Sequence, residues 1–250
     1  MQRFPEQGYI LHKDALQECL SAGHRPLTGA EFALERATHH EKNSPVWKFY
    51  PHTDTFVGVG LGPDLKNNSV PTLLIRHGDH VLSTPDDIAR LRDQGFQRYK
   101  FQLLTNTDKQ LWKQYCEEGL KERGPKRKTW VIQDTALVMM VSGVFSLDDA
   151  PHNSALVPML GDVSIVENYS EGHKINIKPR IGVIFDKDAI SSEVPLVCPL
   201  VFGDIYFDNL VGNGYDYGCV VGVPSGAEGA TQKKLEPRKG SPLALILKSN

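Results

Sequence analysis

The residues best suited to chemistry are Arg76, His77 and Gly78, which follow the apolar segment 70–75. A strand that ends at an imidazole presents a nucleophilic nitrogen, and a neighbouring guanidinium matches the oxygens of a phosphate group. These residue types suit chemistry on a phosphate group. The same chemistry also needs a proton donor and further cationic groups from later in the chain.

The tripeptide resembles the Arg-His-Gly signature of histidine phosphatases. This resemblance implies hydrolysis of a phosphoester, with His77 taking up the phosphoryl group and Arg76 clamping its oxygens. The later histidines, His152 and His173, precede asparagine and lysine, whereas that family uses His-Gly, His-Asp or His-Glu. A strand that ends in a polar turn, with His80 nearby, accounts for the same residues, so both interpretations stay open. No other spacing in the sequence indicates a metal site, a phosphate-binding loop or an acid/base pair, and we expect no cofactor and no metal.

A second group of candidate residues is a basic run that precedes an apolar segment. Its cations attract anionic lipid head groups at roughly 1 kcal/mol each near a membrane surface. Phosphates of RNA are an alternative ligand, although no aromatic stacking platform accompanies the run. A solvated loop after a helix is the simplest interpretation. The predicted lipid-binding residues are Lys121, Arg123, Lys126, Arg127 and Lys128.

The segment 174–185 alternates polar and apolar residues with a period of two, which is typical of a strand. Twelve residues at about 3.3 Å each would span a hydrocarbon layer of about 30 Å. With segment 160–169 and a turn at 170–173 it predicts an amphipathic hairpin, although half-buried hairpins of soluble sheets alternate in the same way. The predicted pore-lining residues are Lys174, Asn176, Lys178 and Arg180, and the membrane-facing ones are Ile175, Ile177, Ile181, Val183 and Phe185.

Composition excludes several classes of protein. With 28 basic and 30 acidic side chains the net charge is −2, which does not suit bulk binding of nucleic acid, and we expect no nucleic-acid partner. The four cysteines form no zinc or disulfide pattern, and the first residues lack the apolar core of a signal peptide, so an intracellular chain with reduced thiols is expected. The longest apolar run, 135–147, is too short for a transmembrane helix.

The elements that must position these residues differ between the two halves of the chain. Helices are predicted over 10–20, 28–37, 84–95 and from 106 to 119 or 124, with strands at 55–61 and 70–75 between them. Strand-like runs dominate afterwards, at 130–147, 160–169, 174–185, 195–207 and 217–223. We therefore predict an α+β fold in one domain over 1–250, with a twisted, largely antiparallel sheet, flanking helices and a mobile tail at 224–250.

The order of segments between 106 and 207 resembles the pore-forming domain of gasdermins. An amphipathic helix (DKQLWKQYCEEGLKERG) precedes a long strand with a Ser-Gly step (TWVIQDTALVMMVSGVFSL), an amphipathic hairpin and a closing strand (PLVCPLVFGDIYFD). The resemblance is to short fungal members that have no inhibitory C-terminal domain and regulate cell death in self/non-self recognition.

This resemblance implies a fold like the gasdermin N-terminal domain and a membrane pore. An inactive cytoplasmic chain would bind acidic phospholipids of the plasma membrane and assemble with itself or with a related allelic chain. The oligomer would insert hairpins at about 155–185 and within 54–104, form a β-barrel pore and cause lytic cell death. A partner chain, in place of proteolysis, would trigger the assembly.

Overall fold

The structure is a computed structural model of the chain, and it describes residues 1–48, 51–94, 96–97, 100–124, 127–133, 143–146, 148, 156–176, 180–183, 188–202, 206–207 and 217–226. These residues include six α-helices and two short 3₁₀ helices. The helices are α1 (His12–Ser21), α2 (Gly29–Thr38), η1 (Pro45–Trp47), α3 (Pro85–Gln94), α4 (Asn106–Lys121), α6 (Leu156–Leu160), α7 (Val163–Asn176) and η3 (Asp188–Ser191).

The strands form one large mixed sheet and one small one. The large sheet contains β1 (Gln2–Phe4), β2 (Ile10–Leu11), β3 (His24–Pro26), β4 (Pro51–Pro63), β5 (Ser69–His77), β6 (Phe96–Gln97), β7 (Lys100–Gln102), β8 (Thr129–Ile132), β11 (Leu196–Val201) and β13 (Tyr217–Pro224). The small sheet contains β9 (Gly143–Ser146), β10 (Arg180–Val183) and β12 (Tyr206–Phe207).

Strand β4 organises the large sheet. It pairs antiparallel with β5 and β11 and parallel with β13, and β13 in turn pairs antiparallel with β1, β2 and β3. On the other side of β5 lies β8, with Arg76 opposite Thr129. The sheet is therefore mostly antiparallel, and the expected α+β class with flanking helices is confirmed.

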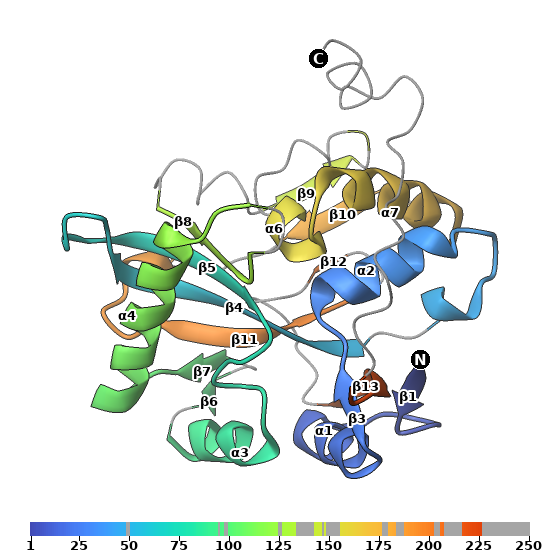
Figure 1. The fold of residues 1–250 in the computed structure, drawn as a ribbon, viewed down its shortest axis with the longest axis horizontal. Helices are drawn as coiled ribbons and strands as arrows, with labels where there is room; N and C mark the ends of the chain where they lie inside the picture. Colours follow the sequence, from blue (N-terminus) through green and yellow to red (C-terminus); the bar gives the residue numbers. More distant parts are fainter. Residues whose placement is uncertain are drawn as a thin grey trace.

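Helices cover both faces of this sheet, so the strands bury both of their faces. Val57 and Val59 of β4 face a core that includes α2, α6 and α7, whereas Phe56 faces a second core that includes α1, α3 and α4. Figure 1 shows α1 and α3 below the sheet and α2, α6 and α7 above it. Burial on both faces explains why β4 and β5 contain long apolar runs.

Glycines of β4 let helix α4 approach the sheet closely. A β-carbon at Gly58 would lie 2.6 Å from the Trp112 ring, and one at Gly62 would lie 2.9 Å from Cys116 Sγ. The Trp112 indole also donates a hydrogen bond of 2.9 Å to the Leu61 carbonyl. The repeated glycines are thus a packing surface for α4, consistent with their lack of a phosphate-loop spacing.

The expected hairpin over 155–185 is wrong in its first arm and its turn. Residues 156–160 and 163–176 are helical, and only 180–183 of the expected second arm forms a described strand. The expected tail, 224–250, lies outside the described residues after position 226.

Candidate functional site

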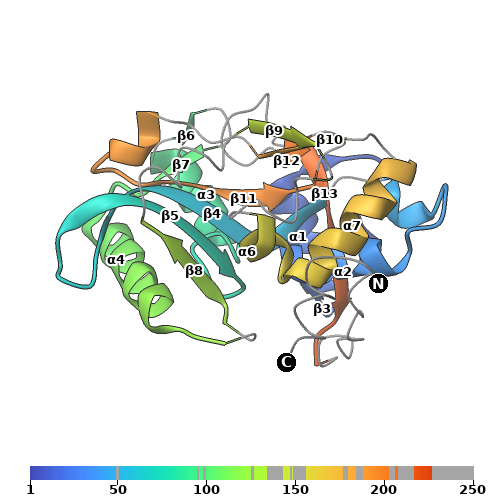
Figure 2. The same ribbon diagram turned by 90° about the horizontal axis from the view of Figure 1, so that it is seen from above.

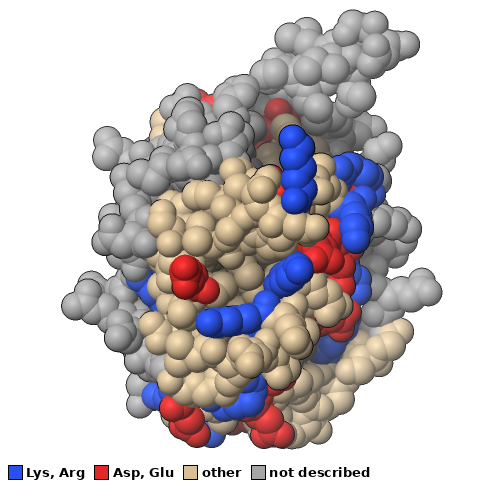
Figure 3. All heavy atoms as spheres, turned by 90° about the vertical axis from the view of Figure 1, so that its left-hand side faces the viewer, with Lys and Arg blue, Asp and Glu red and all other residues tan. Residues whose placement is uncertain are grey.

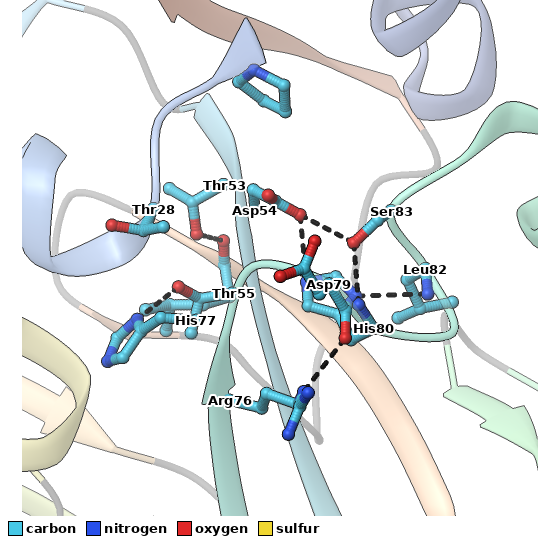
Figure 4. Close-up of polar contacts among 12 residues, drawn as sticks. Thr28, Thr53, Asp54, Thr55, Arg76, His77, Asp79, His80, Leu82 and Ser83 are labelled. Carbon is cyan, nitrogen blue, oxygen red and sulfur yellow. Dashed lines mark hydrogen bonds and ion pairs between the residues drawn. The ribbon is translucent and has the colours of Figure 1, made fainter. Parts of the chain in front are cut away.

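Arg76 joins three elements of the scaffold. Its Nη1 donates to Glu118 Oε2 of α4 at 2.5 Å and to Thr129 Oγ1 of β8 at 2.8 Å, and its Nε donates to the Asp79 carbonyl at 2.9 Å. The guanidinium also lies 4.2 Å from the centre of the Tyr115 ring. Figure 4 shows Arg76 turned toward the loop that follows β5. The side chain is 11% exposed, so its donors serve packing of β5 against α4 and β8.

His77 is buried, and both of its ring nitrogens have partners. Nε2 lies 2.8 Å from the Pro158 carbonyl, which only accepts, so this nitrogen carries the proton. The Thr55 hydroxyl then donates to Nδ1 at 2.6 Å and accepts the Gly29 amide at 2.8 Å. Burial lowers the pKa of His77, which suits this neutral form. The chain of bonds ties β4, β5, α2 and α6 together and occupies the nitrogen that a phosphoryl transfer would need.

Asp54, His80 and Ser83 have the residue types of a catalytic triad but a different geometry. Ser83 Oγ donates to Asp54 Oδ1 at 2.9 Å, and His80 Nδ1 accepts the Leu82 amide at 3.1 Å. His80 Nε2 lies 3.2 Å from Asp54 Oδ1, at an angle that departs from a good hydrogen bond. Burial raises the pKa of Asp54, but His80 and Ser83 outweigh burial and the net pKa is lowered. Neither ring nitrogen of His80 therefore bonds to Ser83, whose Oγ instead accepts the His80 backbone amide at 3.0 Å, and the cluster fixes the loop after β5 (Figure 4).

The basic run forms the connection between α4 and β8, which we call the basic turn: Lys121, Arg123, Arg127 and Lys128. Lys126 lies outside the described residues. Glu122 Oε2 accepts the backbone amides of Lys128 and Thr129 at 2.9 and 2.8 Å, which fixes the turn. Lys121, Arg123 and Lys128 are exposed, and the Arg127 guanidinium stacks on the half-buried Trp130 ring.

The structure brings the basic turn beside the Arg76-His77 strand end. The His77 amide donates to the Lys128 carbonyl at 2.9 Å, and Lys128 Nζ pairs with Asp79 Oδ2 at 2.9 Å. The connection between α4 and β8 lies at an outer edge of the molecule (Figure 2). Figure 3 shows that lysine and arginine side chains occur on the face that carries α4, with acidic side chains beside them. The two motifs are thus one surface region, supported by buried bonds beneath it.

Little of the charge of the basic turn is neutralised by a buried partner. The Lys128–Asp79 pair is exposed at both ends (59% and 77%), and such pairs contribute only about 0–1 kcal/mol. The Glu122 carboxylate is held by backbone amides, and the Glu118 carboxylate by Arg76. Lys121 and Arg123 are exposed on this fixed turn, where Arg123 Nη1 donates to the Glu122 carbonyl at 2.7 Å, and both can meet an anionic partner.

The residues expected to line a pore do not share one face. Lys174 and Asn176 lie in α7, where two residues apart means nearly opposite directions. Lys174 Nζ pairs with Asp148 at 2.7 Å and with Glu171 at 3.4 Å. Asn176 ties α7 to the loop after α2, since its Oδ1 accepts the Asn43 amide at 2.8 Å and its Nδ2 donates to the His40 carbonyl at 3.2 Å.

The residues expected to face lipid are separated as well. Ile175 is exposed on α7, whereas Ile181 and Val183 lie in β10 together with Arg180, antiparallel to β9. Ile177, Lys178 and Phe185 lie outside the described residues. A continuous two-faced ribbon over 174–185 is therefore wrong, because its first three residues are the last turn of a helix.

A local signal for α7 was present in the sequence. Asp162 follows Gly161, and its Oδ1 accepts the Ile165 amide at 2.9 Å, as an N-cap residue does. Val166, Tyr169 and His173 then recur at spacings of three and four and are buried. The β-branched residues around them favour a strand by composition, which explains the wrong prediction of a strand at 160–169.

Among the described residues, none of the helices is long and apolar enough to span a membrane. Over the same part of the chain, no three His, Cys, Asp or Glu side chains come together in a way that could hold a metal ion. The four cysteines are free and buried.

No protein-family model matches this chain, and no curated protein matches it. A solved structure is similar to this chain over most of the length of both. It is described as "Accommodation of massive sequence variation in Nanoarchaeota by the C-type lectin fold". The TM-score is 0.67, with 18% sequence identity, over 89% of this chain and 97% of the other. At this identity the likeness shows the fold: the chain has a C-type lectin fold.

The resemblance to gasdermins is therefore wrong. The matched order of segments depended on a hairpin at about 155–185, and that region contains α6 and α7. The fold over most of the chain is similar to a C-type lectin fold protein. The segments shared a pattern of residue types with gasdermins, which does not determine how those segments pack.

Proposed function

We propose that this chain is a recognition protein that uses a C-type lectin fold as a rigid scaffold and docks on anionic membrane surfaces through its basic turn. The observation that carries the proposal is the fixed, exposed basic turn at the edge of the molecule. The similar protein from Nanoarchaeota is described as a fold that accommodates massive sequence variation. A scaffold of that kind suits recognition, because surface residues vary while buried contacts keep the fold.

The chemistry of the turn favours a flat anionic surface as the partner. Three of its cations, Lys121, Arg123 and Lys128, are exposed close together at the end of α4, so they could reach several head groups at once. At roughly 1 kcal/mol per cation, four cations give about 4 kcal/mol, which corresponds to a dissociation constant near 1 mM. Binding should therefore be weak, salt-sensitive and strengthened where several copies share one surface.

Co-sedimentation with vesicles tests this proposal. Wild-type protein should bind vesicles of phosphatidylserine and phosphatidylcholine at low salt, bind less at physiological salt, and ignore pure phosphatidylcholine. The triple variant Lys121→Glu, Arg123→Glu, Lys128→Glu should bind at least tenfold more weakly. The matched control Lys66→Glu, Lys109→Glu, Lys113→Glu changes the net charge equally at exposed positions away from the turn.

Two results would contradict docking through the turn. Equal loss in the triple variant and its control would mean that net charge alone drives binding. Tighter binding to heparin beads than to anionic vesicles would indicate an acidic polymer as the partner. The folding of each variant is checked by its thermal transition.

The other functions indicated by the sequence stay predictions. Perforation of membranes predicts dye release from the same anionic vesicles, abolished by Lys178→Glu with Arg180→Glu. The phosphatase interpretation predicts hydrolysis of a phosphoester that is lost in His77→Ala. The partners of the His77 nitrogens argue against hydrolysis, since the ring would have to leave Pro158 and Thr55 first.

A further inference from the structure

Two buried histidines stack where three elements meet. His12 begins α1 and His52 is the second residue of β4, and their rings lie 4.2 Å apart with 15° between their planes. The two residues are only 7% and 5% exposed. The pair is thus a direct contact between α1 and the central strand of the sheet.

Strand β13 completes this junction. Val220 lies opposite His52 in the parallel pairing, and a β-carbon at Gly218 would overlap the His52 ring. At the other end of α1, a β-carbon at Gly222 would lie 2.6 Å from Cys19 Sγ. Helix α1 is therefore fitted closely to β13 at Cys19, and at its other end His12 stacks on the His52 ring, which in turn lies against Gly218 of β13.

The surroundings of the pair oppose a positive charge. His12 lies in the first turn of α1, at the positive end of the helix dipole. His52 Nδ1 is buried and has no hydrogen-bond partner that could stabilise an imidazolium. Burial lowers the pKa of His12, and His52 and His80 lower it further; burial lowers the pKa of His52 to about 4.

The other titratable groups near the junction do not compensate. His80 adds to the repulsion on His12, the Asp54 carboxylate is engaged with His80 and Ser83, and Asp14 in the first turn of α1 is exposed beside Lys13. The thiols face the junction in neutral form: burial raises the pKa of Cys19 to about 12, and burial also raises the pKa of Cys219, against the lowering effect of Arg3.

We propose that the stacked His12–His52 pair is an acid-released latch that holds the N-terminal unit, residues 1–26, against β13 and β4. Protonation of His52 at Nδ1 places a charge where that nitrogen has no hydrogen-bond partner, and burial opposes a charge on His12. Protonation of both adds repulsion between rings that lie 4.2 Å apart. Opening lets both rings reach water. The unit that would open contains β1, β2, α1 and β3, all of which contact β13.

The direction and size of the pH effect on opening follow from the linkage between protonation and opening. Between pH 6.5 and about 4 the open form binds a proton at His52 that the closed form does not, so acidification favours opening. From pH 7 to pH 5 the opening constant should rise roughly 20-fold from His52 alone. Opening would expose Phe4, Ala15 and Leu16, which the closed form buries in the second core.

The native cysteines provide the readout. Cys19 lies inside the proposed opening unit, whereas Cys116 lies outside it, on the face of α4 that packs against Gly62 of β4. Full-length protein is labelled with dipyridyl disulfide at pH 7, 6 and 5, and mass spectrometry gives each labelling rate relative to unfolded protein. The relative labelling rate of Cys19 should rise about 20-fold from pH 7 to pH 5, and that of Cys116 should stay the same.

Variants that keep an aromatic ring but cannot take a proton complete the test. His52→Phe should remove the contribution of His52 to the pH dependence at Cys19, His12→Phe should remove that of His12, and the double variant should flatten it, whereas the exposed control His39→Gln should retain the full pH dependence. A pH-independent rate at Cys19, or an equal rise at Cys116, overturns the latch. Where neither Phe variant folds, imidazole NMR of the wild type decides: a ring pair that titrates near pH 6.5 in the folded protein also overturns it.

Discussion

Single side chains in this protein hold together elements that are far apart in the sequence. The Thr55 hydroxyl links the amide that begins α2 to the His77 ring that ends β5, within a strand pair where Thr55 lies opposite His77. His77 extends the chain of bonds to α6 through Pro158. Breaking this series of hydrogen bonds would lower the stability of the fold considerably, because each group that loses its partner stays buried.

Replacement of Thr55 by valine should therefore be strongly destabilising despite its similar shape. The Gly29 amide and His77 Nδ1 would both lose a buried partner, at about 1–3 kcal/mol for each group, and we expect a total loss near 3 kcal/mol. Urea unfolding measures the change. Thr38→Val is the control, since Thr38 is exposed and its hydroxyl bonds only to the Leu34 carbonyl of its own helix. A loss below 1 kcal/mol in Thr55→Val would refute this role.

Replacement of Asp79 should change the affinity for anionic vesicles without changing the stability of the fold. Its carboxylate pairs with Lys128 at the surface, and its backbone has a positive φ of 47°, which asparagine also tolerates. Asp79→Asn should leave the free energy of unfolding within about 0.5 kcal/mol. Without the competing charge, affinity for anionic vesicles should rise about fivefold.

The control for that variant is Asp14→Asn, which removes another exposed carboxylate beside a lysine, on α1. An equal gain in both variants would show that overall charge, and not the basic turn, sets the affinity.

At the scale of elements, α7 shows how tertiary packing decides between a strand and a helix. Gly172 lies in the middle of the helix, where glycine is normally unfavourable, because the Trp47 ring packs directly against it. A β-carbon at Gly172 would lie 2.5 Å from Trp47 Cζ2 and 3.0 Å from His40 Cβ.

Gly172→Ala should thus destabilise the protein even though alanine favours helices. Trp47 is buried and cannot move aside freely, so overpacking should outweigh the gain in propensity and leave a net loss of about 1–3 kcal/mol. In a chain of this length that lowers the thermal midpoint by several degrees, at about 2–4 °C per kcal/mol. Ile175→Ala, on the exposed side of the same helix, should change it little. An unchanged midpoint in Gly172→Ala would mean that α7 does not pack against η1 as described.

Elements with local signals were predictable from the sequence, and those fixed by distant contacts were not. The capping box between Thr28 and Glu31 and the Thr84 cap each lie within four residues, and α2 and α3 begin there. The strands predicted at 55–61 and 70–75 correspond to β4 and β5 at the centre of the sheet. The region 160–176 is rich in β-branched residues, and its helical state depends on packing against α2 and on the Asp162 cap.

The candidate site was predictable only in parts. The basic run and the Arg76-His77 strand end are each visible in the sequence, but about fifty residues separate them. Their contact arises from the pairing of β5 with β8, which no local pattern encodes. The stacked pair His12 and His52 was missed for the same reason, since neither residue stands out in its own segment.

At the scale of the whole molecule, two cores on opposite faces of one sheet enclose groups that must stay uncharged. Neutral His12, His52 and His77 lie at one end of β4, and the neutral thiols of Cys19, Cys116 and Cys219 lie around the sheet. A fold that buries many neutral titratable groups loses stability on both sides of neutral pH, because the unfolded chain ionises them more easily.

We therefore expect a stability optimum between about pH 7 and pH 8. Below pH 6.5 the unfolded chain gains protons that folded His12, His52 and His77 exclude, so the free energy of unfolding falls with pH. His52 alone should remove about 2 kcal/mol between pH 7 and pH 5. Above pH 9 the unfolded chain loses thiol protons that folded Cys19 and Cys116 keep, since burial raises the pKa of both, and the free energy of unfolding falls again.

Urea unfolding at each pH from 4.5 to 10 measures this curve. Cys116→Ser in place of the buried thiol should remove part of the alkaline decline while it leaves the acid side unchanged, and His52→Phe should do the reverse. A curve that is flat from pH 7 to pH 5 would mean that the buried rings already accept protons in the folded state. In that case neither the latch nor the neutral form of His77 would describe the protein correctly.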